Sequence, residues 1–146
     1  MTETQNSGGA GKAVEVAAGL VFRGGKLLIS RRRAEDHLGG LWEFPGGKRE
    51  AGETFEECLR RELREELGVT VEVGALLESI EHEYPGKRVS LRFFCCRLAA
   101  GEPEPQPLGC AALAWVGRGE LGRYEFPAAD ARLLERVGAE VALWNG

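Results

Sequence analysis

The stretch from Gly47 to Val69 constrains this chain most, because it puts acids where a helix normally carries apolar side chains. Residues 54–67 predict a helix, and its apolar stripe consists of Phe55, Cys58, Leu59, Leu63 and Leu67. At about 100° per residue, with Phe55 at zero, Glu62 falls at about 340° and Glu66 at about 20°, inside that stripe. Two inward carboxylates one turn apart are costly unless a cation meets them. A divalent metal ion is the simplest such partner.

The residue types around this helix suit a hard cation such as Mg²⁺ or Mn²⁺. Such ions take oxygen ligands, keep several waters and bind more strongly when substrate phosphates complete the shell. Glu65 lies beside Glu62 and Glu66, and Gly47, expected in a tight turn, offers an unobstructed backbone carbonyl. Metal-bridged phosphates would indicate phosphoryl-group chemistry. The alternative is a solvent-exposed helix laced with Glu/Arg pairs, which fits its other charged residues but not Glu62 and Glu66.

Length and composition predict one domain with its own core. In this 146-residue chain, residues 1–12 are expected to be a disordered segment and residues 13–146 to form the domain. A net charge of −4 and a pI near 5.4 argue against binding to a nucleic-acid polymer. No membrane-length apolar run or signal-peptide layout is present, so a cytoplasmic protein without a membrane partner is expected. The four cysteines lack a C-x-x-C pattern and are expected to be thiols.

The rest of the chain predicts strands and a second helix. Strands are expected at 13–23, 26–30, 42–45, 69–84 (bulged near 79–81), 89–98 and 111–116, and a second helix at 127–137. Arg31-Arg32-Arg33 closes the second strand, either as a solvated edge or with one arginine reaching a nucleotide or phosphate. In the tail, Val141, Leu143 and Trp144 are expected to dock on the surface. This order of elements favours an α+β fold with a mixed sheet packed against helices.

The central stretch resembles the Nudix box, with every defining position filled: Gly47, Glu53, Arg61-Glu62-Leu63, Glu65-Glu66 and Gly68-Val69. The flanks at residues 28–32, 41–48 and 124–130 resemble the MutT-like branch of the Nudix hydrolases, and the likeness covers residues 14–137. The resemblance implies the Nudix fold, a mixed β-sheet sandwiched between α-helices. It also implies hydrolysis of a nucleoside triphosphate to a monophosphate and pyrophosphate by metal-activated water, with Mg²⁺ or Mn²⁺.

Family roles can be carried over position by position. The resemblance implies metal ligation by the Gly47 carbonyl, Glu62 and Glu66, with Glu65 as a further ligand. It implies an orienting pair between Glu53 and Arg61, so that the expected catalytic set is Glu53, Arg61, Glu65 and Glu66. The expected substrate contacts are Arg32, Glu43 and Phe44 at the nucleotide and Lys48 near the phosphates.

Two positions depart from the MutT-like pattern. The family commonly places another Glu, as metal ligand or base, where this chain has Gly109, which leaves Glu65, Glu102 and Glu104 as alternatives for the base. Asp130 stands where the 8-oxo-dGTP-cleaving members carry Asn. An ionised carboxylate only accepts hydrogen bonds, so it suits the amino group of cytosine or adenine and would repel guanine O6. Asp here also resembles the branch acting on CTP and modified dCTP; alternatively, Asp130 only favours the start of the last helix.

The expected function is a Mg²⁺-dependent nucleoside triphosphate pyrophosphohydrolase, a monomer or homodimer that serves nucleotide-pool sanitation. Cytosine nucleotides (CTP, dCTP or modified dCTP) are favoured over 8-oxo-dGTP. The alternatives are an 8-oxo-dGTP diphosphatase, an ADP-ribose-type Nudix hydrolase and a non-catalytic nucleotide-binding Nudix module. The short chain and the flank at residues 41–48 argue against an ADP-ribose-type hydrolase. The complete set of box carboxylates argues against a non-catalytic module.

Overall fold

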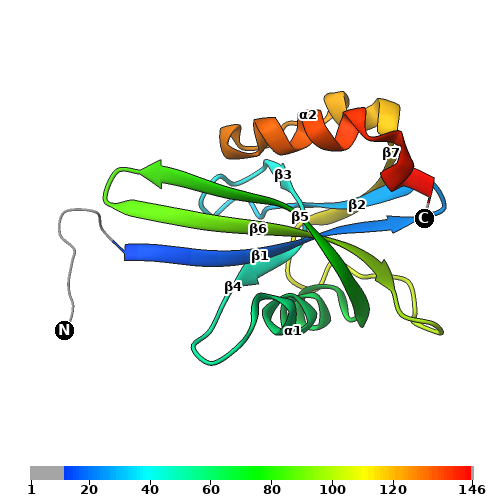
Figure 1. The fold of residues 1–146 in the computed structure, drawn as a ribbon, viewed down its shortest axis with the longest axis horizontal. Helices are drawn as coiled ribbons and strands as arrows, with labels where there is room; N and C mark the ends of the chain where they lie inside the picture. The colour runs from blue at the N-terminus through cyan, green and yellow to red at the C-terminus, as the bar shows by residue number, and fades with distance from the viewer. Residues whose placement is uncertain (1–11, 146) are drawn as a thin grey trace.

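The computed structural model describes residues 12–145, which form a mixed sheet with one helix on each face (Figure 1). Its strands are β1 (Lys12–Arg23), β2 (Lys26–Arg31), β3 (Trp42–Glu43), β4 (Gly46–Lys48), β5 (Val71–Tyr84), β6 (Lys87–Leu98) and β7 (Ala112–Gly117). Its helices are α1 (Phe55–Leu67) and α2 (Ala131–Ala139), with 3₁₀ helices at Arg118–Arg123, Ala128–Asp130 and Val141–Asn145. The predicted α+β class is confirmed.

The sheet has the strand order β3-β2-β1-β6-β5, with β4 also paired to β1 and β7 to β2. The β1–β6 pair is parallel, from Lys12 opposite Lys87 to Val21 opposite Cys96, and the other pairs are antiparallel. The segment predicted to be disordered, residues 1–12, lies outside the described residues except for Lys12, which begins β1. Among the described residues, no helix is long and apolar enough to cross a membrane.

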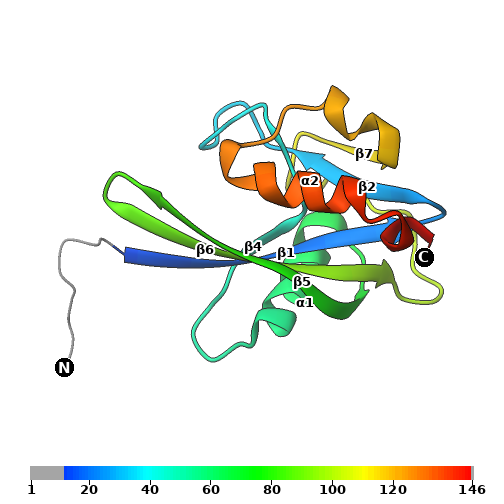
Figure 2. The ribbon, with the colours of Figure 1, turned by 45° about the horizontal axis from the view of Figure 1, so that its top comes forward.

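The alternation of side chains along the strands separates the core into two layers. On β2, Leu27 and Ile29 pack in the cluster that contains Leu133 and Val137 of α2. Leu28, between them, points the other way and joins a cluster with the apolar stripe of α1. The two helices therefore lie on opposite faces of the sheet, as the turned view also shows (Figure 2).

Local sequence signals explain where α1 begins and ends. The Thr54 hydroxyl accepts a hydrogen bond from the Glu57 N–H at 3.0 Å, and the Glu57 carboxylate accepts one from the Thr54 N–H at 2.8 Å. This reciprocal capping box satisfies two backbone donors that the helix leaves free. At the other end, Gly68 adopts φ 71°, a left-handed conformation that glycine takes without strain. The helix predicted at residues 54–67 is confirmed.

Gly46 and Gly47 lie in a strand, and the prediction of a tight turn there is wrong. They form β4 and pair with Ala18 and Ala17 of β1. A Cβ on Gly46 would stand 2.0 Å from the Ala17 carbonyl oxygen. Glycine is needed at this position because the two backbones approach closely, and not because the chain reverses.

The bulge in β5 lies elsewhere than predicted. The pairing with β6 shifts register between Val73 and Leu76 and again between Leu76 and Glu78, whereas the ladder is regular at 79–81. The alternation of the β5 sequence alone does not fix where an extra residue is accommodated, because the partner strand decides it.

The C-terminal segment is part of the core. Trp144 is buried, its ring meets Phe22 edge-to-face at 5.2 Å, and its indole N–H donates to the Val137 carbonyl at 3.0 Å. Leu143 packs against the same cluster, whereas Val141 is 53% exposed. The predicted docking of the tail is therefore confirmed for two of its three apolar residues.

Trp144→Ala should destabilise the domain by about 3 kcal/mol, because it removes a buried aromatic side chain and leaves a cavity beside Phe22. The free energy of unfolding from urea titration measures this loss. Val141→Ala in the same segment is the matched control, and its effect should stay within about 0.5 kcal/mol. Equal effects of the two substitutions would contradict the docked position of the tail.

Candidate active site

The inward face of α1 carries two carboxylates that the protein partly removes from water. The Glu62 side chain is 16% exposed, and burial raises its pKa against the opposing effect of the Arg61 guanidinium. Burial, together with the carboxylates of Glu62 and Glu43, raises the pKa of Glu66 to about 8. Among residues 13–145, Glu66 forms no salt bridge. The helix therefore presents an acid without a cationic partner.

Strand β4 meets these carboxylates with bare backbone. A Cβ on Gly47 would lie 2.2 Å from the Cδ atom of Glu62, so a side chain there would displace the Glu62 carboxylate. The Gly47 carbonyl is within 3.5 Å of the Cys58 thiol, on the side where α1 packs. The carbonyl that the Nudix resemblance assigns to the metal thus lies beside the helix that carries the acids.

Arg61 joins the helix to the loop before it. Its guanidinium donates to the two oxygens of Glu53 at 2.8 and 2.9 Å and to the Lys48 carbonyl at 3.0 Å. It also reaches Glu62 at 2.8 Å and Glu65 at 3.4 Å. Hydrogen bonds from Arg61 lower the pKa of Glu53 to about 2, so this carboxylate stays ionised. The pair expected between Glu53 and Arg61 is formed.

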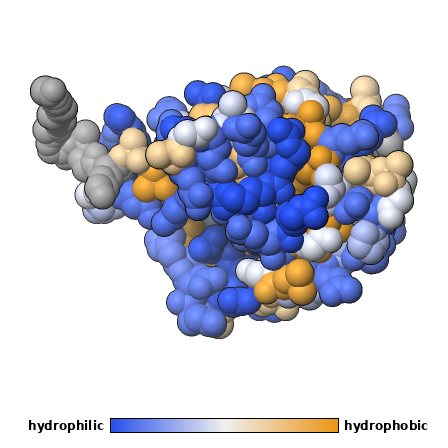
Figure 3. Space-filling model, turned by 90° about the horizontal axis from the view of Figure 1, so that it is seen from below, coloured by the Kyte–Doolittle hydropathy of each residue, from blue (hydrophilic) through white to orange (hydrophobic). Residues whose placement is uncertain are grey.

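The donor chemistry at this site suits a hard divalent cation that substrate helps to hold. Within the described part of the chain, no three His, Cys, Asp or Glu side chains lie close enough to enclose an ion unaided. Glu65 is largely exposed, at 60% of its side chain. Two carboxylates and a backbone carbonyl supply oxygen ligands and leave positions for water and phosphate oxygens, an arrangement typical of Mg²⁺ sites. Seen from the α1 side, this face is largely hydrophilic (Figure 3).

The predicted substrate contacts, which come from separate segments, line one cavity of about 180 Å³. They are Arg32, Glu43, Phe44, Lys48 and Asp130. Arg32 donates to the Glu43 carboxylate at 2.8 Å and to the His37 carbonyl at 2.6 Å. Phe44 is buried and stacks on Phe126 with ring centroids 5.2 Å apart, so it forms an apolar wall of the cavity.

Asp130 is buried at the N-terminal end of α2, with 6% of its surface exposed. Burial, and to a smaller degree the Glu43 carboxylate, raises the pKa of Asp130 to about 7. It occupies the N-cap position of α2 but makes no side-chain capping hydrogen bond. The helix dipole favours an acid at this position without a capping hydrogen bond, so a role at the helix start is compatible with the structure, but it does not explain why Asp130 also lines the cavity.

Sequence reasoning missed the outer wall of this cavity. His37, Leu38, Tyr84 and Lys87 also line it, and the rings of His37 and Tyr84 meet at 5.9 Å. Leu38 has φ 58°, the one positive value among the non-glycine residues that the structure describes. The strands predicted at 69–84 and 89–98 are consistent with the β5–β6 hairpin, but nothing in their sequence indicates that its end reaches the loop after β2.

The acids proposed as substitutes for the missing family glutamate are engaged elsewhere. Glu102 accepts a hydrogen bond from the Thr70 N–H, and Glu104 pairs with Arg23 at 2.9 Å and accepts from the Trp115 indole at 3.0 Å. Gly109 itself lies against Glu66, where a Cβ would come within 3.0 Å of Cγ. Glu65 is therefore the alternative that remains near the helix acids.

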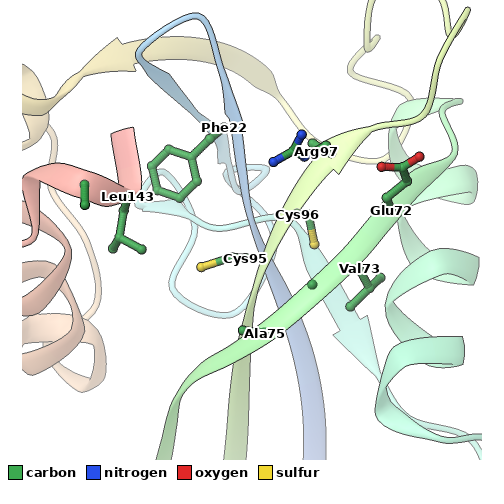
Figure 4. A pocket seen from close by; sticks show the side chains of 10 residues that line it. Phe22, Glu72, Val73, Ala75, Cys95, Cys96, Arg97 and Leu143 are labelled. Carbon is green, nitrogen blue, oxygen red and sulfur yellow. The ribbon is translucent and has the colours of Figure 1, made fainter. Parts of the chain in front are cut away.

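A second cavity, of about 470 Å³, lies at the β5 bulge beside the C-terminal segment (Figure 4). Its lining includes Phe22, Cys95 and Leu143, and none of the predicted site residues. Burial raises the pKa of the Cys95 thiol, which makes it a poor nucleophile.

Comparisons with known proteins agree with this geometry. A model of the NUDIX domain family matches residues 17–136. The 8-oxo-dGTP diphosphatase of Escherichia coli K12 is 34% identical over 130 residues, covering 86% of this chain and 97% of that protein. The CTP pyrophosphohydrolase of the same organism is 38% identical over 129 residues, covering 85% and 90%. The solution structure of the E. coli ORF135 protein superposes with a TM-score of 0.76 and 36% identity, covering 92% of this chain and 94% of that one.

Enzymes of this family generally use a divalent metal ion and act on nucleotide substrates. The family model spans most of the folded chain, and both relatives are matched over nearly their whole length. The chain therefore belongs to the Nudix hydrolase family and is an enzyme.

Proposed function

We propose that this enzyme is a Mg²⁺-dependent nucleoside triphosphate pyrophosphohydrolase that releases a nucleoside monophosphate and pyrophosphate. Its preferred substrates are CTP, dCTP or modified dCTP, and its role is the sanitation of the nucleotide pool. The observation that carries the proposal is the burial of Asp130 in the cavity that also holds Arg32 and Glu43. Relatives named for CTP and for 8-oxo-dGTP support the reaction class.

Strand β4 connects the two halves of the proposed site. The side chain of Lys48 lines the nucleotide cavity, while its carbonyl accepts a hydrogen bond from Arg61. Gly47, the preceding residue, lies against Glu62. A nucleotide whose base enters the cavity would thus extend its phosphates along β4 toward α1, with the Lys48 ammonium beside them.

In this proposal the Gly47 carbonyl, Glu62 and Glu66 would hold the metal, with Glu65 as a further ligand. The ion would supply positive charge to the phosphate oxygens and lower the pKa of a water molecule. Arg61 keeps Glu53 ionised and fixes the loop, so that the ligands are oriented before substrate arrives.

Glu65 is the proposed general base. Its side chain is 60% exposed and makes one long contact, at 3.4 Å, with Arg61. A carboxylate that is accessible to water and weakly held can approach a water molecule and accept its proton. Glu102 and Glu104 have other partners, which supports this assignment.

Substrate choice follows from the hydrogen bonds that Asp130 can make. As a carboxylate it accepts from the exocyclic amino group of cytosine, which favours CTP or dCTP. The second candidate is 8-oxo-dGTP, which the similarity to the E. coli 8-oxo-dGTP diphosphatase favours.

The test is a substrate panel of CTP, dCTP, 5-methyl-dCTP, 8-oxo-dGTP, dGTP and ADP-ribose, assayed with Mg²⁺ and with EDTA. The proposal expects pyrophosphate release that depends on Mg²⁺ and the highest kcat/KM for a cytosine nucleotide. Turnover of ADP-ribose alone would favour the alternative of an ADP-ribose-type hydrolase. Binding without turnover of any nucleotide would favour the non-catalytic alternative and overturn the proposal.

Glu66→Gln should lower kcat by at least about 100-fold, because it removes a metal ligand's charge and keeps its shape. The fold should persist, since the substitution removes a carboxylate that burial already disfavours. Pyrophosphate release and thermal melting measure the two effects. Glu56→Gln, on the exposed face of the same helix, is the control and should retain activity; near-normal turnover of Glu66→Gln would exclude the metal role.

Arg61→Ala should lower both stability and activity. It leaves Glu53 and Glu62 without their common partner and frees the loop from the Lys48 carbonyl. We expect kcat to fall at least about tenfold, together with a lower melting temperature. Arg60→Ala changes the neighbouring exposed arginine and should alter neither quantity. A stable but inactive Arg61→Ala enzyme would show that Arg61 acts on the reaction and not on the loop.

Asp130→Asn should raise the kcat/KM for 8-oxo-dGTP relative to dCTP by about tenfold or more, because the amide donates as well as accepts. The ratio of the two kcat/KM values at a fixed alkaline pH measures the change. An unchanged substrate ranking would refute contact between Asp130 and the base.

A further inference from the structure

The proposed nucleotide cavity, of about 180 Å³, contains two acids, of which only one has a cationic partner. Glu43, on β3, is held by Arg32 at 2.8 Å. Asp130 has no salt bridge among the described residues, although only 6% of its surface is exposed. A buried carboxyl without a cation, facing a second carboxylate, is favoured in its neutral form.

The other ionisable groups around the cavity do not reverse this preference. From the elements that line it, they are Arg32 after β2, His37 in the following loop, Lys48 on β4, Tyr84 on β5 and Lys87 on β6. Arg32 is engaged by Glu43 and by the His37 carbonyl. Burial and the Glu43 carboxylate are what act on Asp130, and they raise its pKa to about 7. Both protonation states are therefore populated near neutral pH.

We propose that Asp130 reads bases in both protonation states, so that the substrate preference of this enzyme changes with pH and Glu43 moves the midpoint of the change to higher pH. The proposal rests on the function proposed above for the identity of the substrates. No covalent step is involved, since Asp130 exchanges its proton with solvent before the nucleotide binds.

The two states of Asp130 match different base edges. The neutral acid carries one O–H donor and one carbonyl acceptor, the same pair that an asparagine amide offers. It can donate to the O6 atom of a guanine-type base and accept from a neighbouring ring N–H. The carboxylate only accepts, so it matches the amino group of cytosine and repels O6. The same side chain therefore favours guanine-type bases when it is neutral and cytosine when it is ionised.

The size of the effect follows from a one-proton equilibrium. Below pH 7 the neutral acid predominates and guanine-type substrates gain; above pH 7 the carboxylate predominates and cytosine substrates gain. The ratio of the two forms changes about tenfold per pH unit. If each substrate uses one form, the ratio of kcat/KM for 8-oxo-dGTP to that for dCTP should fall by up to about 100-fold between pH 6 and pH 8.

The experiment measures this ratio on the wild-type enzyme with saturating Mg²⁺ at half-unit steps of pH. Ionisations in the metal site affect both substrates alike and cancel in the ratio. In parallel, the affinities of CMP and 8-oxo-dGMP are measured by calorimetry over the same pH range with EDTA. A fall in both ratios supports the proposal, and ratios that vary less than about twofold from pH 6 to pH 8 overturn it.

The variants separate protonation from other effects. Asp130→Asn cannot titrate, so its ratios should be flat with pH; a slope retained in this variant would overturn the proposal. Glu43→Gln removes the charge that opposes ionisation of Asp130, so the midpoint should move to lower pH. Glu135→Gln, on the exposed face of α2, is the control and should keep the wild-type midpoint. A midpoint that Glu43→Gln leaves in place, or shifts upward, would refute the part assigned to Glu43.

The calorimetric binding measurements allow this inference to be tested separately from the proposed function. If no nucleotide is hydrolysed but the ratio of monophosphate affinities changes with pH, the enzymatic proposal fails and the reading of bases by Asp130 stands. If nucleotides are hydrolysed but the ratio of kcat/KM values does not change with pH, the enzymatic proposal stands and the inference about Asp130 fails.

Discussion

The closeness of β4 to its neighbours is the constraint on which the rest of the site depends. The backbone of Gly46 leaves no room for a Cβ against β1, and that of Gly47 leaves none against Glu62. Two consecutive glycines thus allow β4 to lie close to the backbone of β1 at Gly46 and close to Glu62 of α1 at Gly47. Any side chain at Gly47 would displace the carboxylate of Glu62 from its present position. The bare backbone at Gly47 therefore leaves the space that the Glu62 carboxylate occupies.

Three acids of the site are partly or wholly withdrawn from water, and each meets the cost of burial differently. Glu53 has Arg61, which lowers its pKa to about 2 and keeps it ionised. Glu66 has no such partner and a pKa raised to about 8, a state that a bound cation would reverse. Asp130 lines the separate cavity, and burial raises its pKa to about 7, so it retains a proton more readily than an exposed acid does. The charge of Glu43 contributes to the raised pKa of both Glu66 and Asp130.

The sequence predicted what local signals determine and missed what distant pairing determines. The limits of α1 follow from Thr54 and Gly68, and the Glu53–Arg61 pair follows from the box spacing, so both could be predicted. The assignment of Gly46-Gly47 to a strand depends on β1, and the β5 bulge depends on β6, so neither could be. The Tyr84 wall of the cavity was missed for the same reason. The neutral tendency of Asp130 was also missed, because burial is not visible in a sequence.

Gly109 bears on the proposal that α1 carries the catalytic acids. The N–H groups of Leu108 and Gly109 both donate to the Glu66 carbonyl, at 2.9 and 3.1 Å, so this loop is pinned to the helix that carries the acids. A larger residue at 109 would press on the Glu66 side chain, because even a Cβ comes within 3.0 Å of Cγ. The loop therefore closes against the site without adding a carboxylate to it. In the proposed mechanism the helix acids then supply both the metal ligands and the base, and differences between substrates arise in the separate cavity, where Asp130 and Glu43 lie.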